Sequence, residues 1–118
     1  MRLKIYIFLI ISIIVSCNTI KKKELIGSWK RINLDCQNCK GYSQKITFTN
    51  DSMFFDEYEN NKLVGRNSTK YEFDEVYKTI NYDAGNVKVK LTVLKLNDID
   101  MELLNTNQKK TMKFKLSK

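Results

Sequence analysis

Two cysteines separated by two residues have the most distinctive chemical potential in this chain. Cys36 and Cys39 lie within residues 35–41, a stretch rich in turn-forming residues. Thiols at this spacing can form a disulfide, act as a redox pair or bind a metal ion. A redox pair usually lies at the N-terminus of a helix that lowers a thiol pKa, but no helical pattern follows Cys39. A zinc site would need carboxylates such as Asp35 to complete four ligands. In an oxidising compartment the spacing favours a Cys36–Cys39 disulfide.

The other reactive residue types do not form a recognisable catalytic arrangement. The chain has no histidine, which removes the commonest general base and the commonest metal ligand. The carboxylate pairs 56–57 and 74–75 are adjacent residues, which point to opposite faces of a strand. Glycine-rich phosphate loops, nucleophile elbows and metalloprotease signatures are absent from the sequence. We therefore expect a protein that is not an enzyme, with no catalytic residue, no metal site and no cofactor.

The third cysteine, Cys17, ends a segment with the anatomy of a secretion signal. Arg2 and Lys4 give it a positive start, and residues 5–15 form an apolar run broken only by Ser12. A stable transmembrane helix needs about 20 apolar residues, so the run is too short to span a bilayer. The alternatives are an ordinary signal peptide cut elsewhere or an N-terminal signal anchor. The last four residues of the segment favour a third alternative, a lipoprotein signal.

Ile14-Val15-Ser16-Cys17 resembles the bacterial lipobox, an aliphatic residue followed by a tolerated position, a small residue and the lipidated cysteine. The resemblance implies that signal peptidase II cuts before Cys17, which then carries acyl chains such as palmitate. Each buried methylene of these chains contributes about 0.8 kcal/mol, so a triacylated cysteine holds its domain on a membrane. We expect residues 1–16 to be the signal peptide, 17–24 a lipidated tether and 25–118 the folded domain.

The position after the lipidation site and the charges that follow bear on location and partners. Asn18 is not the aspartate associated with retention in the inner membrane, so we predict a cell-envelope lipoprotein of the outer membrane that faces the periplasm.

Without Arg2 and Lys4, 19 of the 21 basic residues remain against 13 acidic ones, an excess of about six positive charges. The lysines at 21–23 either belong to a solvated polar surface or attract anionic lipid headgroups. Nucleic acid is not an expected partner, because no nucleic-acid motif is present and export separates the chain from it.

Apolar and polar residues alternate along most of the chain after residue 45, the pattern of half-buried strands. It is clearest at Val87, Val89, Leu91 and Val93, after which the apolar phase slips by one residue and predicts a β-bulge at Leu94. No window of ten residues after Cys17 has helical periodicity. The pattern predicts strands at residues 29–34, 45–49, 53–58, 63–68, 70–74, 79–82, 87–96, 99–103 and 112–116.

Short strands separated by turns predict an antiparallel sandwich or barrel. We favour a barrel, because a chain that begins and ends in strands can pair the first with the last and leave no exposed edge. The predicted fold class is all-β, a small antiparallel up-and-down barrel of about eight strands.

Residues 25–30, Leu-Ile-Gly-Ser-Trp-Lys, resemble the opening of the bacterial lipocalin-like lipoproteins. The similarity continues in outline at 46–48, 71–73 and 98–104 and covers most of the chain after Glu24. It implies a calycin-type barrel that can hold a small hydrophobic ligand or lipid and whose tryptophan, here Trp29, plugs the closed end. Where lipocalins often cover that tryptophan with an arginine of the last strand, this chain has Lys113 and Lys115.

The bulky aromatic residues either fill the barrel or line a ligand cavity, since eight strands enclose a space that side chains can just fill. The candidate ligand-binding residues are Trp29, Phe48, Phe55, Tyr71 and Phe73. One hypothesis is therefore a barrel that binds a small hydrophobic molecule. The other is an interaction protein with a filled barrel, such as an inhibitor, an immunity factor or an envelope assembly accessory. A redox role of Cys36 and Cys39 is the third.

Overall fold

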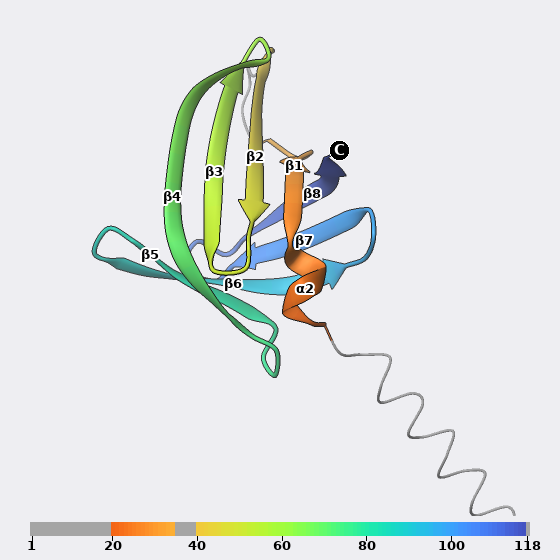
Figure 1. Ribbon diagram of the computed structural model, residues 1–118, viewed down its shortest axis with the longest axis vertical. Helices are drawn as coiled ribbons and strands as arrows, with labels where there is room; N and C mark the ends of the chain where they lie inside the picture. The colour runs from red at the N-terminus through yellow and green to blue at the C-terminus, as the bar shows by residue number, and fades with distance from the viewer. Residues whose placement is uncertain (1–19, 35–39, 118) are drawn as a thin grey trace, which may run out of the picture.

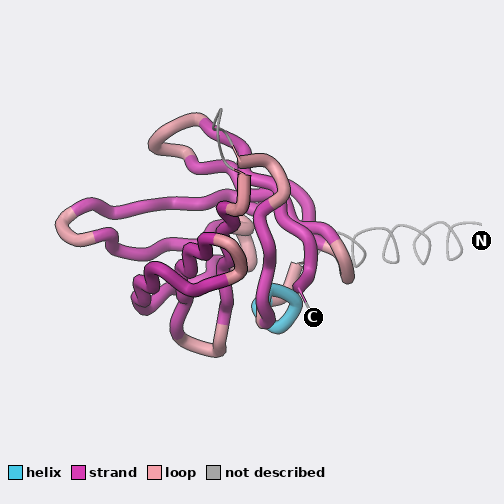
Figure 2. The backbone as a smooth tube through the Cα atoms, turned by 90° about the horizontal axis from the view of Figure 1, so that it is seen from above, coloured by secondary structure: helices cyan, strands magenta, loops and turns pink. Residues whose placement is uncertain are grey.

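The chain folds into a closed β-barrel (Figure 1). The computed structural model describes residues 20–34 and 40–117, so Cys17, Cys36 and Cys39 lie outside the described residues. Each strand pairs antiparallel with the next, and the last pairs with the first, which confirms the predicted fold class. Figure 2 shows that strands make up most of the described chain, with loops and turns between them and one short helix. The elements are α2 (Lys22–Leu25), β1 (Gly27–Arg31), β2 (Tyr42–Phe48), β3 (Ser52–Glu59), β4 (Lys62–Asp74), β5 (Thr79–Ala84), β6 (Val87–Leu96), β7 (Asp100–Asn105) and β8 (Lys110–Ser117).

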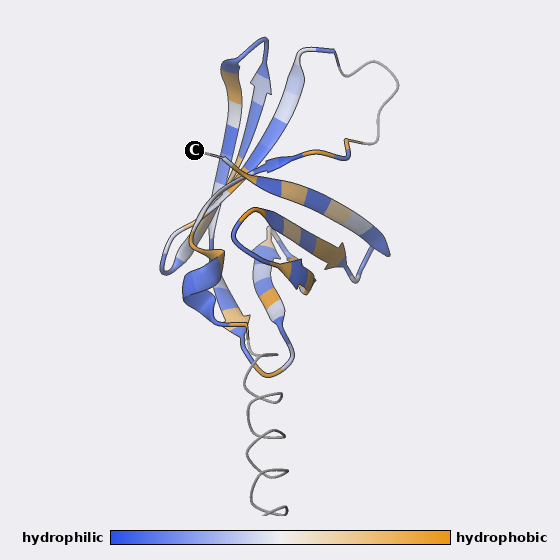
Figure 3. Ribbon diagram, turned by 90° about the vertical axis from the view of Figure 1, so that its right-hand side faces the viewer, coloured by the Kyte–Doolittle hydropathy of each residue, from blue (hydrophilic) through white to orange (hydrophobic). Residues whose placement is uncertain are grey.

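Alternation along the strands decides which side chains fill the barrel, and Figure 3 shows it as alternating polar and apolar bands. Met101 and Leu103 on β7 have no exposed surface, whereas the residues between and beside them are half-buried. Leu91 and Val93 on β6 are buried in the same way. The sequence pattern therefore assigned the inner face of these strands correctly.

Two bulges bend the sheet. On β6, Val93 pairs with Leu103 and Lys95 with Glu102, which leaves Leu94 as the extra residue and confirms the predicted bulge. The second bulge lies between β3 and β4 and coincides with Val64, which has no opposite residue in the register. Bulges increase the local twist of a strand, which helps a sheet of only eight strands to close.

The strands predicted separately at 63–68 and 70–74 are one continuous strand, β4, and this part of the prediction was wrong. The reason is an exchange of partners: β4 pairs with β3 up to Lys70 and with β5 from Tyr71 onward. The chain does not turn where its pairing partner changes. The polar residues at 66–70 resemble a loop in the sequence, although they are part of a strand.

Asn33 extends the contact between β1 and β8, where the barrel closes. Beyond the last residue of β1, the Asn33 side chain accepts a hydrogen bond from Lys113 N at 2.8 Å and donates one to Thr111 O at 3.0 Å. The side-chain amide of Asn33 therefore makes the two hydrogen bonds to β8 that a strand backbone would make if β1 continued. The backbone bond from Ile32 N to Lys113 O, 2.9 Å long, lies beside it.

We expect Asn33→Ala to lower the free energy of unfolding by about 1 to 2 kcal/mol, because two backbone groups of β8 lose their partners. Urea unfolding followed by circular dichroism measures the change. Asn107→Ala is the matched control, since the Asn107 side chain donates one hydrogen bond to Lys88 O, at 3.2 Å, away from the seam. Equal losses in the two variants would contradict the role given to Asn33.

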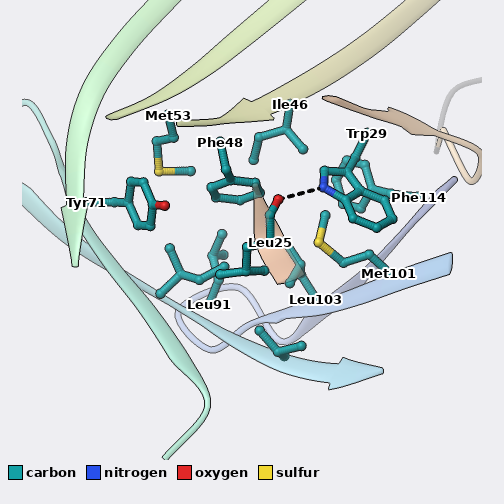
Figure 4. Close-up of a cluster of buried hydrophobic side chains, with 12 residues drawn as sticks. Leu25, Trp29, Ile46, Phe48, Met53, Tyr71, Leu91, Met101, Leu103 and Phe114 are labelled. Atoms are coloured by element: carbon teal, nitrogen blue, oxygen red, sulfur yellow. Dashed lines mark hydrogen bonds between the residues drawn. The ribbon is translucent and has the colours of Figure 1, made fainter. Parts of the chain in front are cut away.

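The end of the barrel beside α2 is closed and filled (Figure 4). Leu25 has no exposed surface, Trp29 is 1% exposed, and the Trp29 indole Nε1 donates a hydrogen bond to Leu25 O at 2.9 Å. Gly27 connects α2 to β1 at φ +141°, a conformation that favours glycine. The buried apolar residues are Leu25, Trp29, Ile46, Phe48, Met53, Tyr71, Ile80, Leu91, Val93, Met101, Leu103 and Phe114.

Part of the segment predicted as a tether belongs to this closed end. Residues 22–24 form most of α2, and Ile20 packs partly buried against the core. The polar composition of 18–24 gave no sign of this, because a single helical turn is too short to show periodicity.

Candidate functional site

The open end of the barrel differs from the closed end because several of its inward positions are polar. Arg31 lies two residues after the buried Trp29 on β1, and Gln44 lies two residues before the buried Ile46 on β2. Period-two alternation therefore directs both side chains into the barrel. Tyr42, two residues before Gln44, continues this row at the rim.

These side chains form a hydrogen-bond network. Arg31 Nη1 donates to Gln44 Oε1 at 3.1 Å, and Gln44 Nε2 donates to the Tyr42 hydroxyl at 3.0 Å. Arg31 Nε also approaches Asn33 Oδ1 at 3.5 Å. Among residues 20–34 and 40–117, no carboxylate lies within ion-pair distance of Arg31. The described partners of this guanidinium are thus neutral amides.

A hollow of about 270 Å³ lies over this network, and we call it the mouth cavity. Apolar side chains of Leu34 and Met112 form part of its wall. Its size suits a small polar group with a short apolar extension. The lining residues are Arg31, Leu34, Tyr42, Gln44, Asn105, Gln108, Lys110 and Met112.

A second hollow, of about 470 Å³, lies where β4 separates from β5, and we call it the side cavity. Phe55 and Tyr82 form its aromatic wall, with ring centroids 5.5 Å apart. Burial raises the pKa of the Tyr82 phenol above its ordinary value. Thr69 Oγ1 donates to Asp83 O at 3.3 Å and bridges the two strands beside this opening.

The five aromatic residues predicted to bind a ligand lie at different depths. Trp29 and Phe48 are 1% exposed and Tyr71 is 5% exposed, all within the packed core. The rings of Phe48 and Tyr71 meet edge to face at 5.4 Å. Phe73 packs half-buried against the core, and Phe55 lines the side cavity.

Tyr71 also has a structural hydrogen bond. Its hydroxyl donates to Thr49 O at 2.6 Å, and burial, followed by the nearby Asp51 carboxylate, raises its pKa. The ring therefore fastens β4 to the β2–β3 turn at the closed end.

Sequence reasoning missed Arg31 and Gln44, because it followed only the apolar members of each alternating strand. The signal was nevertheless present. Counting by two from Trp29 and from Ile46 reaches both residues, and because arginine is rarely buried, an arginine at an inward position of a small barrel indicates a candidate site.

The outer wall of β2, β3 and β4 carries an ion pair beside two aromatic side chains. Asp56 is 3% exposed and accepts hydrogen bonds from Arg66 Nε at 2.7 Å and Nη2 at 3.0 Å. These hydrogen bonds and the negative charge of Asp56 raise the pKa of Arg66 above its ordinary value. Arg66 also lies over the Phe54 ring at 5.7 Å, and Lys45 lies over Tyr58 at the same distance. Because Arg66 already neutralises Asp56, this carboxylate is structural.

The described part of the chain holds no group of three or more potential metal ligands. No helix within it is long and apolar enough to cross a bilayer. No protein-family model matches the chain, and neither a search of curated proteins nor a search of solved structures finds a match. The resemblance to lipocalin-like lipoproteins therefore stays a prediction.

Proposed function

We propose that this chain is a lipid-anchored envelope protein, not an enzyme, whose barrel binds a small amphipathic ligand with an anionic group at its open end. Arg31 is the observation that carries the proposal. It lines the mouth cavity, and its described partners are neutral. A carboxylate can accept two parallel hydrogen bonds from a guanidinium, and such a pair is stronger than a bond to a neutral amide.

The filled closed end limits how such a ligand can lie. Trp29, Phe48 and Leu103 already occupy the base, so an apolar tail cannot run down the full barrel axis. Leu34 and Met112 in the mouth cavity offer apolar contact near Arg31. Phe55 and Tyr82 offer further apolar contact in the side cavity. We therefore infer a short apolar body with one anionic head, a narrower class than hydrophobic molecules in general.

The membrane anchor rests on the sequence. The positively charged start, the short apolar run and the lipobox-like residues 14–17 support cleavage and lipidation at Cys17. A periplasm-facing position in the outer membrane is consistent with Asn18. The membrane, reached through the lipid, is thus the proposed permanent partner.

The ligand proposal predicts that decanoate raises the melting temperature of the protein and that decanol, which lacks the charge, does so much less. At 100 times the dissociation constant, a ligand stabilises the fold by about 2.7 kcal/mol, which corresponds to a shift of at least 10 °C for a domain of about 100 residues. Replacement of Arg31 by Met should weaken decanoate binding by about tenfold to a hundredfold, because a charge-assisted bond contributes about 1.5 to 3 kcal/mol.

Arg66→Met is the matched control, since Arg66 lies on the outer wall and pairs with Asp56. Its decanoate shift, taken relative to its own ligand-free melting temperature, should equal that of the unmodified protein. Equal shifts with decanoate and decanol, or an undiminished decanoate shift in Arg31→Met, would refute the role of the mouth cavity.

A second candidate function is a non-enzymatic interaction protein, and the packed base together with the outer wall favours it. Phe54 and Tyr58, each under a cation, form an aromatic surface on the outside of β3. Aromatic and arginine side chains are frequent anchors at protein interfaces. A partner recovered from solubilised envelope by the unmodified protein, and lost with Tyr58→Ala, would favour this function.

A further inference from the structure

The β4–β5 turn holds two apolar side chains out in solvent at the closed end of the barrel. Val76 is 82% exposed and Tyr77 is 74% exposed. The turn is fixed from within, because Asp74 Oδ1 accepts hydrogen bonds from Val76 N at 2.9 Å and Tyr77 N at 3.2 Å. The two side chains are therefore presented by a defined turn.

This turn lies beside α2, where the described chain begins (Figure 1). Lys22 N donates to Glu75 Oε1 at 3.4 Å, and Lys22 Nζ lies 5.3 Å from the centre of the Tyr71 ring. Ile26 and Ile99, at the same end, are 45% and 61% exposed. We call Ile26, Val76, Tyr77 and Ile99 the closed-end surface.

The distance from the lipidation site restricts what this surface can face. Only three residue steps separate Cys17 from Ile20, and Ile20 already packs against the core. Three extended residues span about 10 Å at most. If Cys17 carries the acyl chains, the closed end must lie within that distance of the lipid backbone.

We propose that the closed-end surface rests on the bilayer, with Val76 and Tyr77 entering the interface and Lys21 and Lys23 contacting anionic headgroups. The inference rests on the lipid anchor of the proposed function. Aliphatic and aromatic side chains favour the interfacial layer, where an apolar body and a polar tip are both accommodated. Exposed lysines beside them gain from the negative surface potential of anionic lipid.

Glu24, Asp51, Asp74, Glu75 and Asp98 also lie at this end and oppose the attraction, so it depends on Lys21 and Lys23 coming closest to the headgroups. Asp74 and Glu75 both accept backbone hydrogen bonds, from Val76 N and Lys22 N, which hold these two side chains against the turn and α2. Glu24 lies in the first turn of α2 between Lys23 and the buried Leu25. Because the mouth cavity lies at the other end of the strands, this orientation turns it away from the bilayer and toward the aqueous phase.

The test uses the full chain, processed and lipidated in a bacterial host and reconstituted into phosphatidylcholine–phosphatidylglycerol vesicles containing lipids brominated near the headgroup end of the acyl chains. Tyr77→Trp places a reporter on the closed-end surface. Val87→Trp is the matched control, because Val87 is 56% exposed at the opposite end of the barrel. The buried Trp29 contributes equally to both variants and is measured in the unmodified protein.

We expect bromine quenching of the added tryptophan at position 77 to exceed that at position 87 severalfold, with a blue shift only at 77. Equal quenching at the two positions, or none at 77 in a chain that remains with the vesicles, would overturn the orientation and leave the anchor standing. A chain that does not remain with the vesicles would overturn both. Quenching at 77 that is unchanged in purely zwitterionic vesicles would overturn the role given to the lysines.

Discussion

Trp29→Ala is expected to lower the free energy of unfolding by about 3 to 5 kcal/mol, a large part of the stability of a domain of this size. The indole is 1% exposed at the base of the barrel, so its removal leaves a cavity that the closed sheet cannot easily collapse around. The hydrogen bond from Nε1 to Leu25 O is lost as well, which frees the turn of α2. Urea unfolding followed by far-ultraviolet circular dichroism measures the loss.

Two further variants separate the packing of the Trp29 ring from its hydrogen bond and from the effect of removing an exposed aromatic residue. Trp29→Phe keeps much of the apolar volume but leaves Leu25 O without its donor, so we expect a loss of about 1 to 3 kcal/mol. This variant keeps the prediction testable if Trp29→Ala does not fold. Tyr77→Ala, at a 74% exposed aromatic residue, should change the stability by no more than about 0.5 kcal/mol. A cost for Trp29→Ala as small as that of Tyr77→Ala would contradict the packing role of Trp29.

Cys17→Ser should move the protein from an almost wholly membrane-bound to an almost wholly unanchored state, because the serine hydroxyl cannot receive the thioether-linked lipid. Fractionation at high salt, which removes attachment by charge alone, measures the distribution. Mass spectrometry of the mature N-terminus identifies the cleavage site and the acyl chains.

Cys36→Ser is the matched control for this effect, since it also removes one thiol but lies after the predicted signal. It should stay with the membrane fraction. Retention of Cys17→Ser in the membrane at the level of Cys36→Ser would show that another feature, such as an uncleaved signal anchor, holds the chain.

The architecture was predictable because it follows from local alternation. The alternation from Val87 to Val93 predicted an inner face without any knowledge of neighbouring strands, and Leu91 and Val93 of this row are buried. The slip at Leu94 gave the bulge. Closure followed from the presence of strands at both ends of the domain. These features depend on period two, which is written directly in the sequence.

The remaining features depend on contacts between distant residues. Asn33 is an ordinary polar residue until β8, about 80 positions later, brings Thr111 and Lys113 beside it. Arg31 becomes part of a candidate site only because the fold brings Gln44, on another strand, within hydrogen-bond distance. The continuity of β4 was hidden because its partner changes along its length. The candidate site was therefore less predictable than the fold that holds it.

The proposed anchor at Cys17 gives the position of β1 a mechanical consequence. The residues of β1 are bonded on one side to β2 and on the other to β8, and the strand runs away from α2, the end nearest to the proposed anchor. Antiparallel hydrogen bonds lie perpendicular to the strand, so a pull along β1 loads both rows in shear. Many bonds must then yield together, whereas a tether joined across the strand direction would peel them away one after another.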